Sequence, residues 1–302
     1  MKILFVLLGP TGVGKTALSL RLAQHLGCPV ISVDSRQIYK EMPVGTAAPS
    51  DDIRASVQHY FIATHSVTDY YSASLYEVEA LTVINKLHET HDCLLLCGGS
   101  MLYIDAVCKG INDMPTVTQD IRQALWQQYI NEGLASILEE LKTSDPDHYK
   151  AVDRMNHRRV IHAVEICRMT GKPYSSFRTN EEKIRPFKIC KIGLTLNRKE
   201  LFERINKRVD EMIANGLVEE AKRLYPMREE NALNTVGYKE LFSCFDGIYS
   251  FDEAVEKIKR NTRIYARKQM TWFRKDKSIN WFNPDNEDAI INFVDFVRFE
   301  NK

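Results

Sequence analysis

One glycine-rich stretch near the amino terminus carries residue types suited to phosphate. Its residues are Gly9, Pro10, Thr11, Gly12, Val13, Gly14, Lys15 and Thr16. They fit the P-loop pattern G-x-x-x-x-G-K-[ST], in which backbone N–H groups surround a phosphate and the lysine adds a positive charge. We expect a diphosphate or nucleotide to bind here, with Lys15 and Thr16 as catalytic candidates and Thr16 as a Mg²⁺ ligand. The alternative is an ordinary glycine turn.

A carboxylate follows the next apolar run. Asp34 stands directly after the run from Val30 to Val33. In open α/β sheets, ligands lie outside the carboxyl ends of the strands, so we expect Asp34 near the bound phosphates. It would serve as a general base or a Mg²⁺ partner; an N-cap or turn aspartate is the alternative.

A third apolar run, from Cys93 to Cys97, ends in Gly98-Gly99-Ser100. Many P-loop hydrolases carry an acidic residue at such a strand end to organise Mg²⁺ and water. Glycines and a serine in its place indicate that the phosphate is held without being hydrolysed. The alternative is that the glycines only make a tight turn from strand to helix.

Two arginines could add charge to the same site. Arg204 and Arg208 stand four residues apart in a segment, Arg198 to Asn215, that has the apolar spacing of an amphipathic helix. Two guanidinium groups on one helix face suit an anion such as diphosphate. Ion pairs with Glu200 or Glu211 are the alternative.

Two further clusters are basic. One lies in a helical stretch and contains Arg154, His157, Arg158, Arg159, His162 and Arg168. The other lies in an expected helix from Phe251 to Phe273 and just beyond it, and contains Lys257, Lys259, Arg260, Arg263, Arg267, Lys268, Arg274, Lys275 and Lys277. Aromatic residues interleave with the second cluster, which suits a nucleic-acid backbone. The alternative for both is a solvated helix face.

The elements that must position these residues alternate between strand and helix. Ile3 to Leu8 is an unbroken apolar run, typical of a strand buried on both faces. A helix follows the P-loop, and another is expected near Ser74 to His88. The inward face of that second helix is predicted to be Leu75, Val78, Leu81 and Leu87. The fold class is therefore α/β, a P-loop NTPase-like parallel sheet flanked by helices.

The alternation stops near residue 115. Gln119 to Lys142 is predicted to be helical with a break at Gly133, and Asp147 to Thr170 continues helical. Phe187 to Leu196 is expected to return to the sheet. We therefore expect a P-loop core made of residues 1–115 and 184–302, and an all-helical insertion over residues 116–183.

Overall composition sets limits on partners. The chain has 302 residues, 44% of them hydrophobic, and a net charge of +1, so no global field attracts RNA or membrane. Its seven cysteines include no C-x-x-C pair, and the opening apolar run is too short to span a bilayer. We expect a cytoplasmic monomer with no membrane partner.

Several separated motifs resemble the tRNA dimethylallyltransferase (tRNA isopentenyltransferase) family. Residues 9–16 resemble its G-P-T-A-S-G-K-T, residues 34–39 match D-S-x-Q-x-Y, and residues 45–47 match G-T-A. Residues 98–100 resemble G-G-T, residues 237–240 match G-Y-K-E, and residues 265–272 resemble Y-A-K-R-Q-x-T-W. Gly12-Val13 stands where Ala-Ser is usual, Ala48 replaces a common lysine, Ser100 replaces threonine, and Arg267-Lys268 inverts the usual order.

The resemblance implies an activity. A dimethylallyl group would pass from dimethylallyl diphosphate to N6 of adenine 37 in tRNA, with Asp34 accepting the proton. Mg²⁺ would assist, and the insertion and the basic C-terminal helix, including Arg263 and Arg267, would hold the anticodon stem-loop. By position, the remaining tRNA-contacting residues would be Ser35, Arg36, Gln37, Ile38, Ser100, Arg122, Arg158, Arg159, Val160, Ile161 and His162. The alternatives are a P-loop kinase for a nucleotide or metabolite, and a non-catalytic RNA-binding protein.

Overall fold

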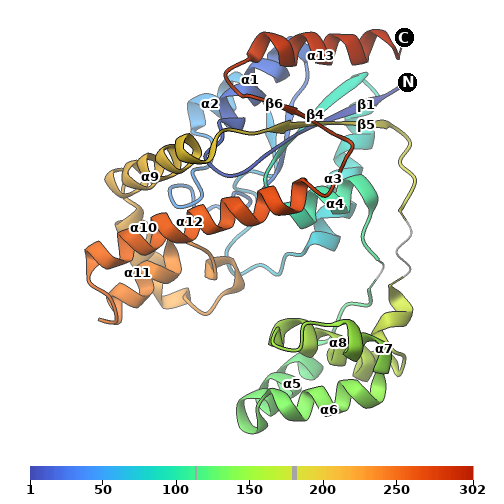
Figure 1. Ribbon diagram of the computed structural model, residues 1–302, viewed down its shortest axis with the longest axis vertical. Coiled ribbons are helices and arrows are strands. Elements are labelled where there is room, and N and C mark those ends of the chain that lie inside the picture. Colours follow the sequence, from blue (N-terminus) through green and yellow to red (C-terminus); the bar gives the residue numbers. More distant parts are fainter. Residues whose placement is uncertain (113, 179–181, 302) are drawn as a thin grey trace. The chain divides into compact units, whose positions relative to one another are not determined.

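The computed structural model describes residues 1–112, 114–178 and 182–301, and it contains a six-stranded parallel sheet (Figure 1). The strand order is β3-β2-β4-β1-β5-β6, and every neighbouring pair is parallel. The strands are β1 (Ile3–Leu8), β2 (Val30–Val33), β3 (His59–Tyr60), β4 (Cys93–Gly98), β5 (Lys188–Leu194) and β6 (Ile279–Phe282). The expected α/β parallel sheet is confirmed.

The contacts divide the described chain into two compact units. One contains residues 1–109 and 184–302, and the other contains residues 110–183. The second unit therefore begins six residues before the expected position 116, and the expected insertion also covers residues 179–181, which lie outside the described residues.

Helices cover both faces of the sheet in the first unit, with α1 and α13 on one side and α3 and α4 on the other (Figure 1). Helices α9 to α12 pack on one another beside the sheet. The helices of this unit are α1 (Lys15–Leu26), α2 (Asp51–Ser56), α3 (Ala73–His88), α4 (Met101–Lys109), α9 (Arg198–Ala214), α10 (Leu217–Leu224), α11 (Tyr238–Phe245), α12 (Phe251–Phe273) and α13 (Glu287–Phe299).

The order of the central strands brings three loops together. β1 and β4 are buried along their whole length, as strands between two helical layers must be. β4 lies between β2 and β1, so the loops after all three strands leave the same edge of the sheet side by side. Those loops carry the P-loop, Asp34 and Gly99.

One expected helix face was wrong. Leu75 and Val78 of α3 are exposed, Leu81 and Leu87 are half-buried, and the buried stripe contains Tyr76, Ala80 and Ile84 instead. Tyr76 belongs inside because its hydroxyl donates to Ser32 O at 2.7 Å. Both stripes have helical spacing, and the one with hydrogen-bonding partners in the sheet is the one buried.

The second unit is a helical bundle. It contains α5 (Gln119–Glu132), α6 (Leu134–Ser144), α7 (Pro146–Ala151) and α8 (His157–Thr170). The break predicted at Gly133 is confirmed. The continuous helix expected from Asp147 to Thr170 is wrong, because the chain leaves the helix after α7 and begins α8 with Asn156 as its side-chain cap.

Two further observations concern the cysteines and the apolar character of the helices. All seven cysteines are unpaired in the described chain. Across the residues that the structure describes, no helix is both long enough and apolar enough to cross a membrane.

Candidate active site

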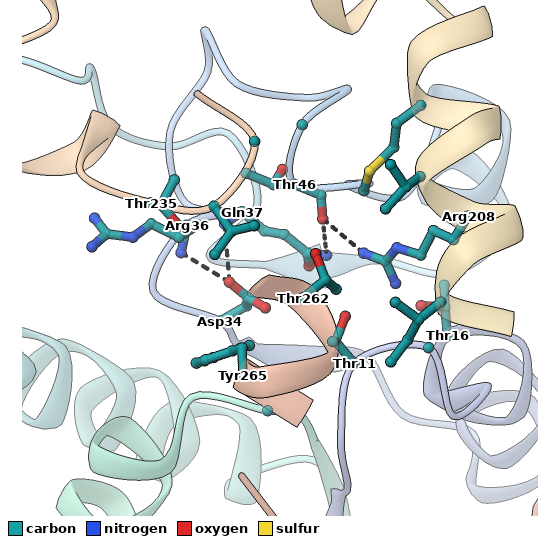
Figure 2. Close-up of a pocket in the computed structure, with 18 of the residues that line it drawn as sticks. Thr11, Thr16, Asp34, Arg36, Gln37, Thr46, Arg208, Thr235, Thr262 and Tyr265 are labelled. Atoms are coloured by element: carbon teal, nitrogen blue, oxygen red, sulfur yellow. Dashed lines mark hydrogen bonds between the residues drawn. The ribbon is translucent and has the colours of Figure 1, made fainter. Parts of the chain in front are cut away.

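A cavity of about 590 Å³ lies at the edge of the sheet where β1, β2 and β4 end. The P-loop forms its floor, with Asp34 on one wall and α9 on the other (Figure 2). Lys15, Thr16, Asp34, Arg204 and Arg208 all line it. These side chains were expected to serve one site, and the structure brings them together.

The P-loop holds its lysine close to its own backbone. Lys15 Nζ donates to Gly9 O at 3.0 Å and to Pro10 O at 2.8 Å. Burial lowers the pKa of Lys15 to about 8, and the positive charge of Arg208 acts in the same direction. A bound anion would favour the charged form of Lys15 and so oppose this lowering of its pKa, and the loop is therefore suited to a diphosphate.

Gly12 has a close neighbour that explains part of the departure from the family pattern. Its φ of +80° favours glycine, and a Cβ there would lie 2.8 Å from Ile205 Cγ1. The adjacent Val13 side chain is fully buried. Val13 therefore contributes packing and its backbone to the loop, with no side-chain contact to an anion.

A buried glutamine ties the P-loop to the turn after β4. Gln269 of α12 is 1% exposed, and its Oε1 accepts from Thr11 N at 2.9 Å. Its Nε2 donates to Gly99 O at 2.8 Å. A Cβ on Gly99 would lie 2.5 Å from Nε2, so glycine leaves the room that the amide occupies. Sequence reasoning missed Gln269, although it lies in the motif of residues 265–272.

Asp34 makes a turn that orients its carboxylate. Its Oδ1 accepts from Arg36 N at 2.9 Å and from Gln37 N at 3.3 Å. The other oxygen faces the cavity (Figure 2). Asp34 is therefore a turn aspartate, as the alternative interpretation of the sequence expected. The turn uses only one carboxylate oxygen, so the other is available for chemistry.

The loop after Asp34 is held from two sides. Ser35 N donates to Ser100 Oγ at 2.8 Å, which joins the ends of β2 and β4. Gln37 Nε2 donates to Thr46 O and to Ala47 O, both at 3.2 Å. These bonds fix the Asp34 wall against the segment of Thr46.

The two arginines of α9 have different environments. Arg204 pairs with Glu200 at 2.7 Å and with Asp285 at 3.2 Å, so the ion-pair alternative is observed for it. Arg208 donates to Thr46 O at 3.3 Å, and burial lowers its pKa while Asp34 raises it. Arg208 points toward Thr46 at the cavity (Figure 2). Because Arg204 is already paired with two carboxylates, Arg208 is the cation better placed to meet an anion there.

A second anchor holds the Thr46 segment, and sequence reasoning missed it. Glu220 is 1% exposed and accepts from Val44 N at 2.9 Å, Gly45 N at 2.8 Å and Tyr238 OH at 2.6 Å. A Cβ on Gly45 would lie 2.4 Å from the Tyr238 hydroxyl. The G-T-A and G-Y-K-E motifs therefore meet at one buried carboxylate. These two motifs were the signal in the sequence that a shared partner such as Glu220 exists.

Comparison with known proteins gives this arrangement a family. A model of the IPP transferase family matches residues 37–276. This chain belongs to the IPP transferase family. It is 61% identical over 294 residues to tRNA dimethylallyltransferase 2 of Parabacteroides distasonis, covering 97% of this chain and 98% of the relative. It is 55% identical over 293 residues to tRNA dimethylallyltransferase 1 of Bacteroides fragilis, covering 97% of each.

Solved structures agree with the IPP transferase assignment. The tRNA isopentenylpyrophosphate transferase of Bacillus halodurans has a TM-score of 0.72 and 32% identity, with 100% of both chains covered. A eukaryotic dimethylallyltransferase acting on tRNA has a TM-score of 0.79 and 26% identity, with 94% of this chain and 74% of the other covered. The family expected from the motifs is confirmed.

The residues expected to contact tRNA fall into exposed and buried groups. Arg158, Arg159 and His162 are exposed on α8. Val160 and Ile161 instead lie in the hydrophobic core of the second unit, at 0% and 5% exposure, so the expectation that their side chains meet RNA needs correction. Helical spacing explains this, because consecutive residues of a helix cannot all face outward.

Other expected contacts already have protein partners. Ile38 is 1% exposed and packs in the core, so its side chain is likewise corrected to a packing role. Arg122 lies 3.7 Å from Glu165, and Arg263 donates to Asn206 Oδ1 at 2.6 Å. Arg36 lines the cavity and donates to Asn231 O at 3.2 Å, while Arg267 is exposed.

The cavity has a chemistry compatible with Mg²⁺. The Thr16 hydroxyl and the Asp34 carboxylate are both oxygen ligands, and both line it. No group of three or more His, Cys, Asp or Glu side chains that could hold a metal occurs among the described residues. Mg²⁺ needs no such group, because it usually keeps its waters and binds substrate phosphates with one or two protein oxygens.

Proposed function

We propose that this protein transfers a dimethylallyl group from dimethylallyl diphosphate to N6 of adenine 37 in tRNA, giving N6-(dimethylallyl)adenosine. The observation that carries the proposal is the position of opposite charges across one cavity. Lys15 and Arg208 line it as cations, and the Asp34 carboxylate lines it as an anion and a base. The relatives named above from Parabacteroides distasonis and Bacteroides fragilis are tRNA dimethylallyltransferases, which agrees with it.

The leaving group determines what the cations do. When the allylic C–O bond breaks, the departing diphosphate gains negative charge and the allyl group gains positive charge. P-loop amides, Lys15 and Arg208 would stabilise that anion, and their prior organisation makes such stabilisation effective. Mg²⁺ bound through Thr16, with Asp34 nearby, would supply further charge neutralisation on the diphosphate.

The nucleophile determines what Asp34 does. The exocyclic amine of adenine is a weak nucleophile because its lone pair is delocalised into the ring. The carboxylate oxygen of Asp34 that faces the cavity would accept the proton as the N–C bond forms. Two backbone N–H groups fix the other oxygen, so little reorganisation is needed when the base reacts.

The cavity also has a wall suited to five carbons. Its apolar lining residues are Ile205, Val209 and Met212 of α9, together with Leu217 and Ile258. A dimethylallyl group is apolar, so it gains by leaving water for this surface. Exclusion of water here would also protect the allyl cation from hydrolysis.

The acceptor requires an RNA-binding surface. A base within a stacked loop must be turned out to reach an enclosed carboxylate. The exposed basic residues of α12 and α8, with Ser35 and Ser100 near Asp34, would hold the anticodon stem-loop through phosphate contacts and shape. We place this reaction in the cytoplasm and assign it to a monomer.

One experiment tests the proposal against its rival, a P-loop kinase. Purified protein is incubated with Mg²⁺, unmodified tRNA, labelled dimethylallyl diphosphate and, in parallel, labelled ATP. The proposal predicts prenyl label in tRNA and no phosphoryl transfer from ATP. Phosphoryl transfer without prenyl incorporation would establish the kinase, and tight tRNA binding with neither reaction would indicate a non-catalytic RNA-binding protein.

A further inference from the structure

Three aromatic rings of the second unit lie in nearly parallel planes. Trp126 and Tyr129 belong to α5, and His157 is the first residue of α8. The interplanar angles are 11° between Trp126 and Tyr129, 6° between Tyr129 and His157, and 14° between Trp126 and His157. Here these three residues are called the Trp126 platform.

The distances exclude a sandwich with Tyr129 in the middle. The centroids of Trp126 and His157 are 6.2 Å apart. Two successive face-to-face contacts of about 3.5 Å would separate them by roughly 7 Å or more. The Trp126 and His157 rings therefore do not cover opposite faces of Tyr129, and the platform is broader and shallower than a three-ring column.

One ring of the platform packs on the core of the second unit, and another is exposed to solvent. Tyr129 packs against the buried core of the unit, which includes Leu125, Ile137 and Leu141. Trp126 is 44% exposed. A rigid, half-exposed indole fixed on a packed base is suited to stacking with another flat ring, because its orientation needs no further ordering.

Positive charge gathers beside the platform, in the first turn of α8. His157 is followed by Arg158 and Arg159, both exposed, and the described first turn of α8 has no acidic residue. The amino-terminal end of a helix carries partial positive charge, so cations there are unfavourable unless an anion lies close. External phosphates would relieve this repulsion and accept hydrogen bonds from the two guanidinium groups.

We propose that the Trp126 platform stacks an unpaired base of the substrate tRNA, while Arg158 and Arg159 bind the phosphates beside that base. This rests on the proposed function for the identity of the RNA. Single-stranded RNA is bound by aromatic rings combined with cations, and stacking of this kind needs no particular base. The platform would therefore add affinity for the anticodon loop without reading its sequence.

The test uses tryptophan as its own reporter. The chain has three tryptophans, so replacing Trp272 and Trp281 with Phe leaves Trp126 as the only one. The probe is an anticodon stem-loop RNA, together with copies that carry one abasic nucleotide at each loop position in turn. We expect RNA to quench Trp126 emission, and one abasic copy to quench it much less.

Binding measurements complete the test. In the otherwise native chain, Trp126→Ala should weaken stem-loop binding by about tenfold, as loss of one stacked base does. Trp126→Phe should restore most of that loss, because a flat ring remains. Gln127→Ala, a change at the exposed neighbour on α5, should leave the dissociation constant unchanged.

The outcomes separate this proposal from the proposed function. If native protein prenylates tRNA while Trp126→Ala binds the stem-loop as tightly as native protein, the stacking proposal is overturned. A fall in kcat with unchanged binding would also overturn it. If native protein fails to prenylate tRNA but abasic-sensitive quenching is seen, the proposed function falls and the stacking site stands.

Discussion

Gln269 and Thr11 are 258 residues apart in the chain, and the side-chain oxygen of the first accepts the backbone N–H of the second at 2.9 Å. The same amide group donates to Gly99 O at 2.8 Å. The helix that carries the basic C-terminal residues is therefore hydrogen-bonded directly to the phosphate loop. Gln269 is a positioning residue for that loop.

Gln269→Leu should raise the donor KM. The change leaves the Thr11 N–H and Gly99 C=O groups buried without their partner, at a cost of about 1–3 kcal/mol, so the loop loses its fixed shape. If the whole of this cost appears in donor binding, it corresponds to a donor KM increase of roughly five- to 150-fold in steady-state kinetics, at about 1.4 kcal/mol per factor of ten. The tRNA KM should be little changed. Met270→Leu is the control. A lower melting temperature with native donor KM would reduce Gln269 to a purely structural role.

Asp34→Asn should separate catalysis from binding. Asparagine can keep the acceptor for the Arg36 and Gln37 amides, but it cannot take a proton from adenine. We expect kcat to fall by about 10²- to 10⁴-fold, the usual contribution of a general base. The dissociation constant for tRNA, measured by filter binding, should stay within about twofold of native. Equal losses in both quantities would remove the base assignment.

Arg208→Gln should impair donor use more than Arg204→Gln. Both arginines line the cavity, but Arg204 is already paired with Glu200 and Asp285, whereas Arg208 donates to the carbonyl of Thr46. We expect kcat/KM for the donor to fall by about 10²-fold or more in the Arg208 variant, as when a stabilising donor is removed. Similar losses in the two variants would show that both guanidinium groups serve the diphosphate equally.

Lys15 should give donor use a pH dependence. Burial lowers the pKa of this amine to about 8, so the cation is present below that pH and is lost above it. The donor kcat/KM, which reports the free enzyme, should therefore decline as pH rises through about 8. Lys15→Met should have low activity and lack this decline. The same decline in Lys15→Met would assign it to another group.

Arg267→Gln should change the salt dependence of tRNA binding. Arg267 is exposed on α12, and if its guanidinium group binds a phosphate, the glutamine variant releases one counterion fewer when tRNA binds. The slope of log K against log salt concentration should become shallower by about 1. Lys86→Gln, at an exposed position on α3, is the control. An unaltered slope in Arg267→Gln would mean that this residue binds no phosphate.

The sequence predicts the parts of the site that are local. The P-loop needs only neighbouring residues, and Asp34 follows from the rule that ligands lie at strand ends. Gln269 could not be found this way, because its partners depend on how α12 docks against two distant turns. The basic residues of its motif are the more conspicuous feature of that stretch, and they point to RNA binding and not to a contact with the P-loop.

The error on α3 has a similar origin. Leu75 and Val78 belong to one apolar stripe of that helix, and Tyr76 belongs to another. Hydrophobicity alone favours the first stripe. The fold buries the second, because Tyr76 donates to Ser32 O and the adjacent Glu77 pairs with Arg185 at 2.8 Å. Because these polar groups find hydrogen-bonding and ion-pair partners far along the chain, the free-energy cost of burying them is small.

The most direct test of the account uses two tRNAs that differ at one base. Native protein, Mg²⁺ and dimethylallyl diphosphate are incubated with unmodified tRNA and with the same tRNA carrying guanine at position 37. Mass spectrometry of the digested nucleosides should find N6-(dimethylallyl)adenosine in the first sample and none in the second. Prenylation of both tRNAs, or of neither, would contradict the account.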